Sequence, residues 1–444
     1  MGFCENPDRV EPQPRPHPPT PAVALLSRAP PTTPWRLTVR RSRRIVSWLI
    51  CPLLAATGHT LMPPTTAAAK ASDGATFNDP LVGSKRYALT THVRALIDRT
   101  PGASTRAVGA TIQVAMYTYS NAERKTVDAL VRAARRGVNV RLLLDSDKTL
   151  EPGYRRYASF FRGLQKKHPT FRVAFCPIGR GCIGNAHPDS NNHNKFFLFS
   201  RTYGTDRVVV QSSANLTRAN SVSYWNNAVT LANPGLYDDY LAYFDDLWKQ
   251  QPTDDYGRVT VSGNAKAWHF PMATGDPVAE TLNSDVACTG NGIVGYGGRS
   301  IVRVAMKDFY RSEVAEALWS LADRGCRVEV AYDEPSALQP YRAQSAAVLA
   351  ALRRPLSRPG GSLRLFVAGP PTRKHPQRRL IHSKYLLIEG GFEGQADSKV
   401  VFTGSHNFSY GSLRDNDETL LRVNSASLHD RFRANFARII STLD

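Results

Sequence analysis

The sequence predicts an α/β protein built from two duplicated lobes. Each lobe is expected to hold a mixed, largely parallel β-sheet flanked by helices, and a pseudo-twofold axis should relate the two. The chain has 444 residues, which suits two domains of ordinary size better than one core. A strand, helix, strand pattern also occurs twice, with Met116 and Met306 at matching positions 190 residues apart. A steady offset of this kind indicates an internal duplication.

Each copy of the repeat has the pattern of a βαβ unit. A short apolar strand is followed by a helical stretch, a glycine and a second apolar strand. The glycine stands where a left-handed residue caps a helix, and unbroken apolar strands are typical of buried parallel sheets. The pattern therefore favours sheets with helices on both faces. The matched segments are 112–116, Gly137 and 138–145 in the first copy, and 302–306, Gly325 and 326–333 in the second.

Three regions are predicted along the chain. Residues 1–71 form a Pro-rich extension and a secretory signal, 72–270 form the N-terminal lobe, and 271–444 form the C-terminal lobe. The boundary falls in the stretch 262–290, which has Gly, Asn and Asp-Pro punctuation and no strong period.

The N-terminal region contains the parts of an export signal. Basic residues between Arg40 and Arg44 precede the apolar run 45–56, and small residues follow up to Ala71. The apolar run is too short for a permanent membrane span. We therefore expect cleavage near Ala71 and a secreted, extracellular protein; an N-terminal membrane anchor is the alternative.

The charge of the chain is strongly positive. It has 57 Lys and Arg against 37 Asp and Glu, a formal net charge of +20. Without residues 1–71 the counts are 48 and 34, so the basic character belongs to the folded part. Such a charge favours polyanionic partners, either a phospholipid membrane surface or nucleic acid. Hydrophobic residues make up 42% of the chain, which excludes a largely disordered protein.

Four cysteines follow the predicted cleavage site. An exported protein can oxidise all four, and four cysteines allow three pairings. We expect Cys176 to pair with Cys182, and Cys288 with Cys326, because each pair then stays within one half. The spacing contains no CxxC motif, which argues against a zinc site.

Two short polar motifs recur in register with the repeat. His193-Asn-Lys195 and His382-Ser-Lys384 are 189 residues apart, and an apolar run follows each. Residues i and i+2 of a strand point to the same side, so the histidine and lysine of each motif should project together.

Further polar segments follow each motif. Ser213 and Asn215 recur as Ser405 and Asn407, and small or amide side chains there suit contact with phosphate oxygens. Beyond them, the segments 226–228 and 416–418 can be aligned with each other. In this alignment Asn226 matches Asn416, and Ala228 matches Glu418, so only the second copy has the carboxylate.

These motifs resemble the phospholipase D superfamily, whose signature is HxKxxxxD with a GSxN segment and a following Asn-x-Glu. The resemblance covers roughly residues 80–440, and its specificity comes from two copies in register with a duplicated βαβ unit. The sequence departs from the signature at four positions. They are Ser200 and Glu389 in place of the Asp, Ser212 in place of the Gly, and Ala228 in place of the first Glu.

The resemblance implies a phosphodiesterase with one active site and no metal or cofactor. One histidine attacks phosphorus to form a phosphohistidine, and the other protonates the leaving alcohol and then activates water. In similar enzymes a carboxylate of one half orients the histidine of the other, which makes Glu418 the support of His193. His193 would then be the nucleophile and His382 the general acid and base. Lys195 and Lys384 would neutralise the phosphate. The phosphate-binding side chains would be Ser213, Asn215, Asn226, Ser405, Asn407 and Asn416.

The motifs indicate a phosphodiester without indicating what it joins. Phospholipid head-group release is the first hypothesis, a metal-independent nuclease the second, and a non-catalytic anion-binding relative with a depleted first half the third. Basic residues between Arg373 and Arg379 precede the second motif, and the stretch 154–172 interleaves aromatic and basic side chains. That stretch suits an anionic bilayer, a single nucleic-acid strand or an amphipathic helix with a buried aromatic face. No protein partner is implied, and we expect a monomer.

Overall fold

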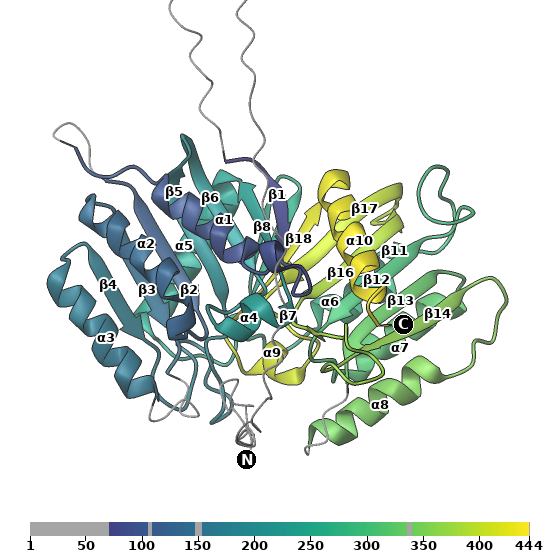
Figure 1. The fold of residues 1–444 in the computed structure, drawn as a ribbon. Coiled ribbons are helices and arrows are strands. Elements are labelled where there is room, and N and C mark those ends of the chain that lie inside the picture. Colours follow the sequence, from purple (N-terminus) through teal and green to yellow (C-terminus); the bar gives the residue numbers. More distant parts are fainter. Residues whose placement is uncertain (1–70, 105–108, 147–152, 335–339, 444) are drawn as a thin grey trace, which may run out of the picture. The chain divides into compact units, whose positions relative to one another are not determined.

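The protein contains two large β-sheets flanked by helices (Figure 1). The computed structural model describes residues 71–104, 109–146, 153–334 and 340–443. The predicted fold class is confirmed, because each sheet mixes parallel and antiparallel strands and carries helices on both faces. The extension and export signal predicted for residues 1–71 lie, up to residue 70, outside the described residues.

The first sheet has seven strands in the order β1-β8-β6-β5-β2-β3-β4. Its parallel strands are β2 (Thr111–Met116), β3 (Asn139–Leu144) and β4 (Phe171–Phe175). Its antiparallel strands are β1 (Gly74–Phe77), β5 (Lys195–Thr202), β6 (Thr205–Ser212) and β8 (Asn227–Ala232). Its helices are α1 (Ala88–Asp98), α2 (Arg124–Arg135), α3 (Gly153–Lys167), α4 (Arg218–Val222) and α5 (Pro234–Lys249).

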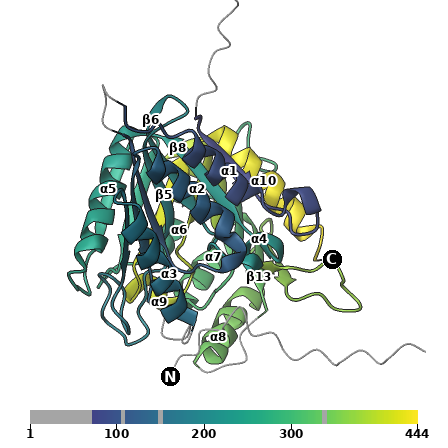
Figure 2. The ribbon, with the colours of Figure 1, turned by 60° about the vertical axis from the view of Figure 1, so that its left-hand side comes forward.

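The first predicted βαβ unit is present as β2, α2 and β3. Gly137 ends the helical segment at φ 84°, a conformation that costs glycine little and other residues more. Helices α1, α2 and α3 share one buried cluster with β2 and β3, to which Leu96, Leu130 and Phe161 contribute. Helix α5 lies on the opposite side of the sheet from α1 and α2 (Figure 2).

The second sheet has nine strands, with β11 paired to β16 beside the path β14-β13-β12-β16-β17-β18-β10-β9. Its parallel strands are β12 (Ile301–Met306), β13 (Arg327–Asp333) and β14 (Ser362–Ala368). Its antiparallel strands are β9 (Arg258–Ser262), β10 (Ala265–Phe270), β11 (Val286–Ala287), β16 (Lys384–Phe392), β17 (Gln395–Gly404) and β18 (Glu418–Asn424). Its helices are α6 (Pro277–Ser284), α7 (Ser312–Asp323), α8 (Tyr341–Arg353), α9 (Tyr410–Arg414) and α10 (Ala426–Ile440).

The predicted boundary between residues 270 and 271 stays a prediction. Strands β9 and β10 precede that position, yet β10 pairs with β18 and β9 pairs with β10, so both belong to the second sheet. The second sheet therefore begins in the chain at Arg258.

The two lobes share one hydrophobic core. Helix α5 contacts β9 and β10 of the second sheet, and α10 contacts β1 of the first. One buried cluster includes Phe196 and Val229 from the first sheet together with Val401 and Leu421 from the second. Because these side chains leave water only when both lobes are folded, apolar burial holds the lobes together.

Two short backbone pairings also cross between the lobes. Strand β7 (Tyr224–Trp225) runs parallel to β15 (Leu380–Ile381), and Asn192 forms a parallel bridge with Asp417. Each pairing lies directly before one of the two His-x-Lys motifs. The two pairings therefore occupy equivalent positions in the two copies of the repeat.

Both predicted disulfides are present. Cys176 is bonded to Cys182, and Cys288 to Cys326, with sequence separations of 6 and 38. Among the described residues, no helix combines the length and the apolar character needed to cross a membrane.

The disulfide between Cys288 and Cys326 is predicted to stabilise the fold more than the other one. Closing a longer loop removes more entropy from the unfolded chain, by about 4 kcal/mol for this loop against about 2 kcal/mol for the shorter one. Paired alanine substitutions at each disulfide, compared by urea unfolding, should show this ranking. Equal losses would contradict the loop-length argument.

Candidate active site

The two His-x-Lys motifs lie at the same end of their sheets. Lys195 begins β5 and pairs with Met116, the last residue of β2. Lys384 begins β16 and pairs with Met306, the last residue of β12. The motifs therefore stand beside the carboxyl ends of the parallel strands, where side chains from several strands can converge.

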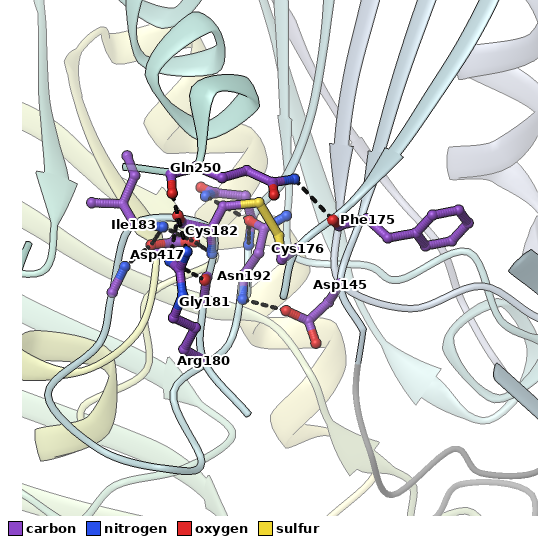
Figure 3. Close-up of a disulfide and its surroundings, with 12 residues drawn as sticks. Asp145, Phe175, Cys176, Arg180, Gly181, Cys182, Ile183, Asn192, Gln250 and Asp417 are labelled. Carbon is purple, nitrogen blue, oxygen red and sulfur yellow. Dashed lines mark hydrogen bonds between the residues drawn. A yellow bond between two sulfur atoms is a disulfide. The ribbon is translucent and has the colours of Figure 1, made fainter. Parts of the chain in front are cut away.

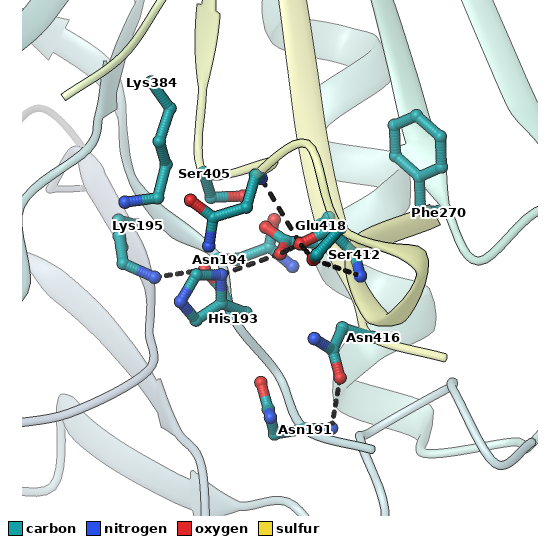
Figure 4. Close-up of polar contacts among 12 residues, drawn as sticks. Asn191, His193, Asn194, Lys195, Phe270, Lys384, Ser405, Ser412, Asn416 and Glu418 are labelled. Atoms are coloured by element: carbon teal, nitrogen blue, oxygen red, sulfur yellow. Dashed lines mark hydrogen bonds and ion pairs between the residues drawn. The ribbon is translucent and has the colours of Figure 1, made fainter. Parts of the chain in front are cut away.

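His193 is held by a carboxylate of the other lobe (Figure 4). Its Nδ1 lies 2.7 Å from Oε1 of Glu418, which begins β18. The same oxygen accepts a hydrogen bond from the Ser412 hydroxyl at 2.8 Å. The His193 side chain is 14% exposed, whereas Glu418 is fully buried. The imidazole is therefore accessible to a substrate, and the carboxyl group behind it is not. The predicted contact between these two residues is thus present.

His382 is held by an amide instead. Its Nδ1 lies 3.0 Å from Oδ1 of Asn226, and the Ser213 hydroxyl donates to the same oxygen at 2.9 Å. The Asn226 amide nitrogen donates to the Asn220 carbonyl at 2.9 Å, which fixes the orientation of the amide. The Tyr224 ring stacks on His382 with ring centroids 5.8 Å apart.

The alignment of Ala228 with Glu418 was wrong. Asn226 and Glu418 occupy equivalent places, since each binds Nδ1 of the histidine from the other lobe. The next residues confirm the register, because Asn227 and Thr419 donate their backbone N–H to Ser213 and Ser405, both at 3.0 Å. The true offset is 192 residues, the same as that between the two serines. The first half therefore has an amide where the second has the carboxylate.

Backbone hydrogen bonds fix both motifs in a matching way. The N–H of His193 donates to the Asp417 carbonyl at 2.9 Å, and that of His382 donates to the Trp225 carbonyl at 2.8 Å. One residue earlier, Asn192 and Ile381 donate their N–H to carboxylates, each at 2.6 Å. These carboxylates belong to Asp145 and Asp333, the last residues of the two matched repeat segments. Their role was not predicted from the sequence.

Asp417 ties the loop closed by the first disulfide to the site (Figure 3). Its buried carboxylate accepts N–H groups of Cys182 at 2.6 Å, Ile183 at 3.1 Å and Gly184 at 2.6 Å. Since Asp417 directly precedes Glu418, this anchor from the first lobe helps to place the residue that supports His193. The sequence pattern placed Asp417 in the aligned segment 416–418 but did not predict this anchoring role.

Three lysines meet at the site. Lys195 and Lys384 donate to the carbonyl groups of His193 and His382, at 2.5 and 2.9 Å. Lys307, which follows β12, is near enough to both histidines for its charge to contribute to the lowering of their pKa values. Lys307 forms an ion pair with Asp308 at 3.4 Å, which raises its pKa. Sequence reasoning missed it, since Tyr117 occupies the matching position of the first half.

Burial governs the protonation of the site. It lowers the pKa of His193 and of His382 well below the usual value, and the nearby lysines add to this effect. Burial also raises the pKa of Glu418 to about 8, against the opposing influence of Lys195. The pKa of Lys384 falls to about 7 for the same reason, with a further contribution from Lys307. The imidazole of His193 is therefore neutral near pH 7, as nucleophilic attack requires.

The other predicted phosphate-binding residues line or support the site. Asn407 donates its amide to Asp308 at 2.9 Å, and Asn416 accepts the backbone N–H of Asn191 at 3.0 Å. The backbone N–H of Asn215 donates to the amide oxygen of Asn220 at 3.1 Å. Contact of these side chains with phosphate stays a prediction, as it does for Ser213, Asn226 and Ser405.

Two of the departures from the signature, Ser200 and Glu389, have structural contacts of their own. The Ser200 hydroxyl accepts the backbone N–H of Thr111 at 2.8 Å, and Glu389 forms an ion pair with Arg303 at 2.8 Å. Both residues lie inside their strands and away from the histidines in sequence.

The aromatic residues of the stretch 154–172 pack inward. Phe161 and Phe171 are fully buried, and the ring of Phe161 lies 5.2 Å from that of Tyr119. Tyr157 contacts the same tyrosine at 5.6 Å. Of the three interpretations, the structure supports the amphipathic helix with a buried aromatic face for these residues. The side chain of Tyr154 lies outside the described part.

Comparisons with known proteins agree with this architecture. A family model described as "Cardiolipin synthase, PLD-like domain" matches residues 105–248 and 298–440. The phosphatidylserine synthase of Haemophilus influenzae Rd KW20 has a similar fold, with a TM-score of 0.52 and 12% identity over 81% of this chain and 85% of that one. The polyphosphate kinase of Porphyromonas gingivalis matches with a TM-score of 0.50 and 12% sequence identity. That match covers 82% of this chain but only 50% of the kinase. No curated protein matches the chain in sequence.

The two family matches together cover more than half of the chain and fall on the two copies of the repeat. The chain therefore belongs to the phospholipase D-like domain family. It is a duplicated member of the phospholipase D superfamily of phosphodiesterases and phosphotransferases.

Anion binding at this site should weaken as pH rises through about 7. Below its lowered pKa Lys384 carries the positive charge that attracts an anion, and above it the charge is lost. Sulfate is a suitable probe because it does not titrate in this range. Calorimetry between pH 6 and 8 should show affinity falling with pH, and Lys384→Met should bind sulfate more weakly with a flatter pH profile. A wild-type affinity that does not change with pH would contradict the expected titration.

Proposed function

We propose that the protein cleaves a phosphodiester through a covalent phosphohistidine on His193, with His382 as general acid and base. The observation that carries this assignment is the unequal support of the two rings. Oε1 of Glu418 lies 2.7 Å from Nδ1 of His193 and accepts its N–H when Glu418 is ionised, a form that gains population as the pH approaches its pKa of about 8. The partner of His382 is a neutral amide oxygen, which lies 3.0 Å from Nδ1. A carboxylate stabilises positive charge that develops on the imidazole during attack, and an amide does so less.

In the first step Nε2 of His193 attacks phosphorus. Its Nδ1 is engaged with Glu418, so Nε2 is the nitrogen left to react. The negative charge of the bound phosphodiester favours the protonated form of His382. The bond between phosphorus and the leaving oxygen breaks as Nε2 of this imidazolium gives its proton to that oxygen. The weaker support from Asn226 makes His382 a weaker base, and thus a better acid. Lys195, Lys384 and Lys307 would stabilise the charge that develops on the phosphoryl oxygens.

In the second step the proton moves in the opposite direction. Nε2 of His382 removes a proton from water or another alcohol, whose oxygen bonds to phosphorus while the bond to His193 breaks. The acceptor enters where the leaving group departed, on the side of His382. Water gives hydrolysis and an alcohol gives transfer.

A phospholipid is the substrate we propose, with release of its head group at a membrane surface. The description of the matching family and the phosphatidylserine synthase with a similar fold support a lipid phosphodiester. The net charge of +20 favours an anionic surface. We also propose an extracellular location, which two disulfides and the predicted export signal support.

The roles of the two histidines predict different behaviour with bis(4-nitrophenyl) phosphate. Its leaving group needs no proton, so His382→Asn should still form the intermediate and then stall. The expected result is a burst of about one nitrophenol per chain, followed by turnover reduced roughly 10²- to 10⁴-fold. His193→Asn should give no burst. Rapid quenching and peptide mass spectrometry should find the phosphoryl group on His193.

The opposite pattern would reverse the assignment. A burst that survives in His193→Asn, with the phosphoryl group on His382, would make His382 the nucleophile. The control is Ser200→Ala, because Ser200 lies within β5 and bonds only the backbone of Thr111 among its described contacts.

The lipid proposal predicts head-group release from phosphatidylcholine vesicles in the presence of chelator. The release should disappear in His193→Asn. Single- and double-stranded DNA should be tested beside the vesicles. Cleavage of DNA alone, with the steep salt dependence of counterion release, would replace the lipid proposal with a nuclease.

A further inference from the structure

A basic cavity lies between the lobes on the side of His382. It has a volume of about 430 Å³. Its walls come from the start of α1, from α4 and β7, and from the loop that leads into β15. The residues that give it its chemical character are Arg86, Tyr87, Arg218, Tyr224 and Arg379.

The charge of this cavity is not balanced locally. None of the residues that line it is acidic. None of its three arginines forms an ion pair with a carboxylate in the part of the chain that the structure describes. Arg303 and Arg311 behave differently, since each pairs with a carboxylate at 2.8 Å. Arg86 and Arg379 donate to backbone carbonyl groups, and the donors that remain on the three guanidinium groups favour an anion, in particular a phosphate.

Tyr224 connects the cavity to the reacting centre. Its ring lines the cavity and stacks on His382, with centroids 5.8 Å apart and an angle of 13° between the planes. Leu380, two residues before His382, lines the cavity as well. The phenol of Tyr224 also lies within electrostatic range of Lys307. A group bound in the cavity would therefore lie near the oxygen that His382 protonates.

The matching positions of the second half hold different residues. With the offset of 192 residues, Asn416 corresponds to Tyr224 and Tyr410 corresponds to Arg218. On that side Tyr117 packs edge-on against His193, with centroids 5.1 Å apart. The arginines thus mark one side of an otherwise duplicated site, namely the side where the alcohol leaves and enters.

We propose that this cavity binds a phosphate group carried by the alcohol that leaves from, or enters at, the His382 side. The inference rests on the proposed function for the direction of the reaction. In the transfer step the alcohol gives its proton to His382 and its oxygen bonds to phosphorus, while the bond to His193 breaks. The second phosphate remains unreacted and holds the alcohol in place through Arg86, Arg218 and Arg379.

The test compares two acceptors for the same phosphoryl enzyme. Bis(4-nitrophenyl) phosphate supplies the phosphoryl group, and glycerol or glycerol 3-phosphate accepts it. Chromatography of the products gives the ratio of the two transfer rates at equal acceptor concentration. We expect glycerol 3-phosphate to be preferred at least tenfold, and Arg218→Ala or Arg379→Ala each to lower that preference about tenfold, since each removes a charged hydrogen-bond donor. The control is Arg201→Ala, which removes an exposed arginine paired with Asp206.

A binding measurement keeps the two proposals apart. Calorimetry with glycerol 3-phosphate on the full chain should show binding that weakens about tenfold in Arg218→Ala and not in Arg201→Ala. If wild-type protein releases no nitrophenol but shows this pattern of binding, the proposed function fails and the phosphate site stands. Equal affinity in wild type, Arg218→Ala and Arg379→Ala, or equal use of glycerol and glycerol 3-phosphate, would overturn the site.

Discussion

The contact between Glu418 and Nδ1 of His193 is the constraint on which the rest of the site depends. Both groups are largely removed from water, and a buried carboxylate without a partner would cost free energy. The contact spans two lobes, so it forms only when their relative position is correct within the tolerance of a hydrogen bond. The shared core supplies the force that holds the lobes, and the two backbone crossings set their register. The N–H groups around Asp417 then fix the residue next to Glu418.

In the proposed mechanism, the unequal halves give direction to a reaction that a symmetric site could run either way. Glu418 behind one imidazole and the Asn226 amide behind the other are the difference from which we assign the nucleophile and the acid. Lys307 has no lysine counterpart in the first half, because Tyr117 takes its place. The arginine cavity lies on the same side as His382. All three differences distinguish the His382 end of the site, where the proposed mechanism has the alcohol depart, from the His193 end.

The sequence was sufficient for features that depend on local pattern. The βαβ units follow from apolar strands and capping glycines, and the two His-x-Lys motifs follow from spacing within a strand. The partner of His382 could not be read in this way. Matching Asn226 to Asn416 by residue type gave the wrong register, whereas hydrogen bonding across the lobes shows that it matches Glu418. Lys307 was missed for a related reason, since a search for repeated residues overlooks one that occurs in a single copy.

Fusion of the two copies in one chain explains how such differences can persist. In a dimer of identical subunits every substitution appears twice, so replacing the glutamate by asparagine would remove the support from both histidines at once. In a single chain with both copies, one position can change while its twin is kept. The pair Asn226 and Glu418 is the outcome of that freedom. A duplicated gene can thus turn a site with two identical ends into one whose two ends hold different residues.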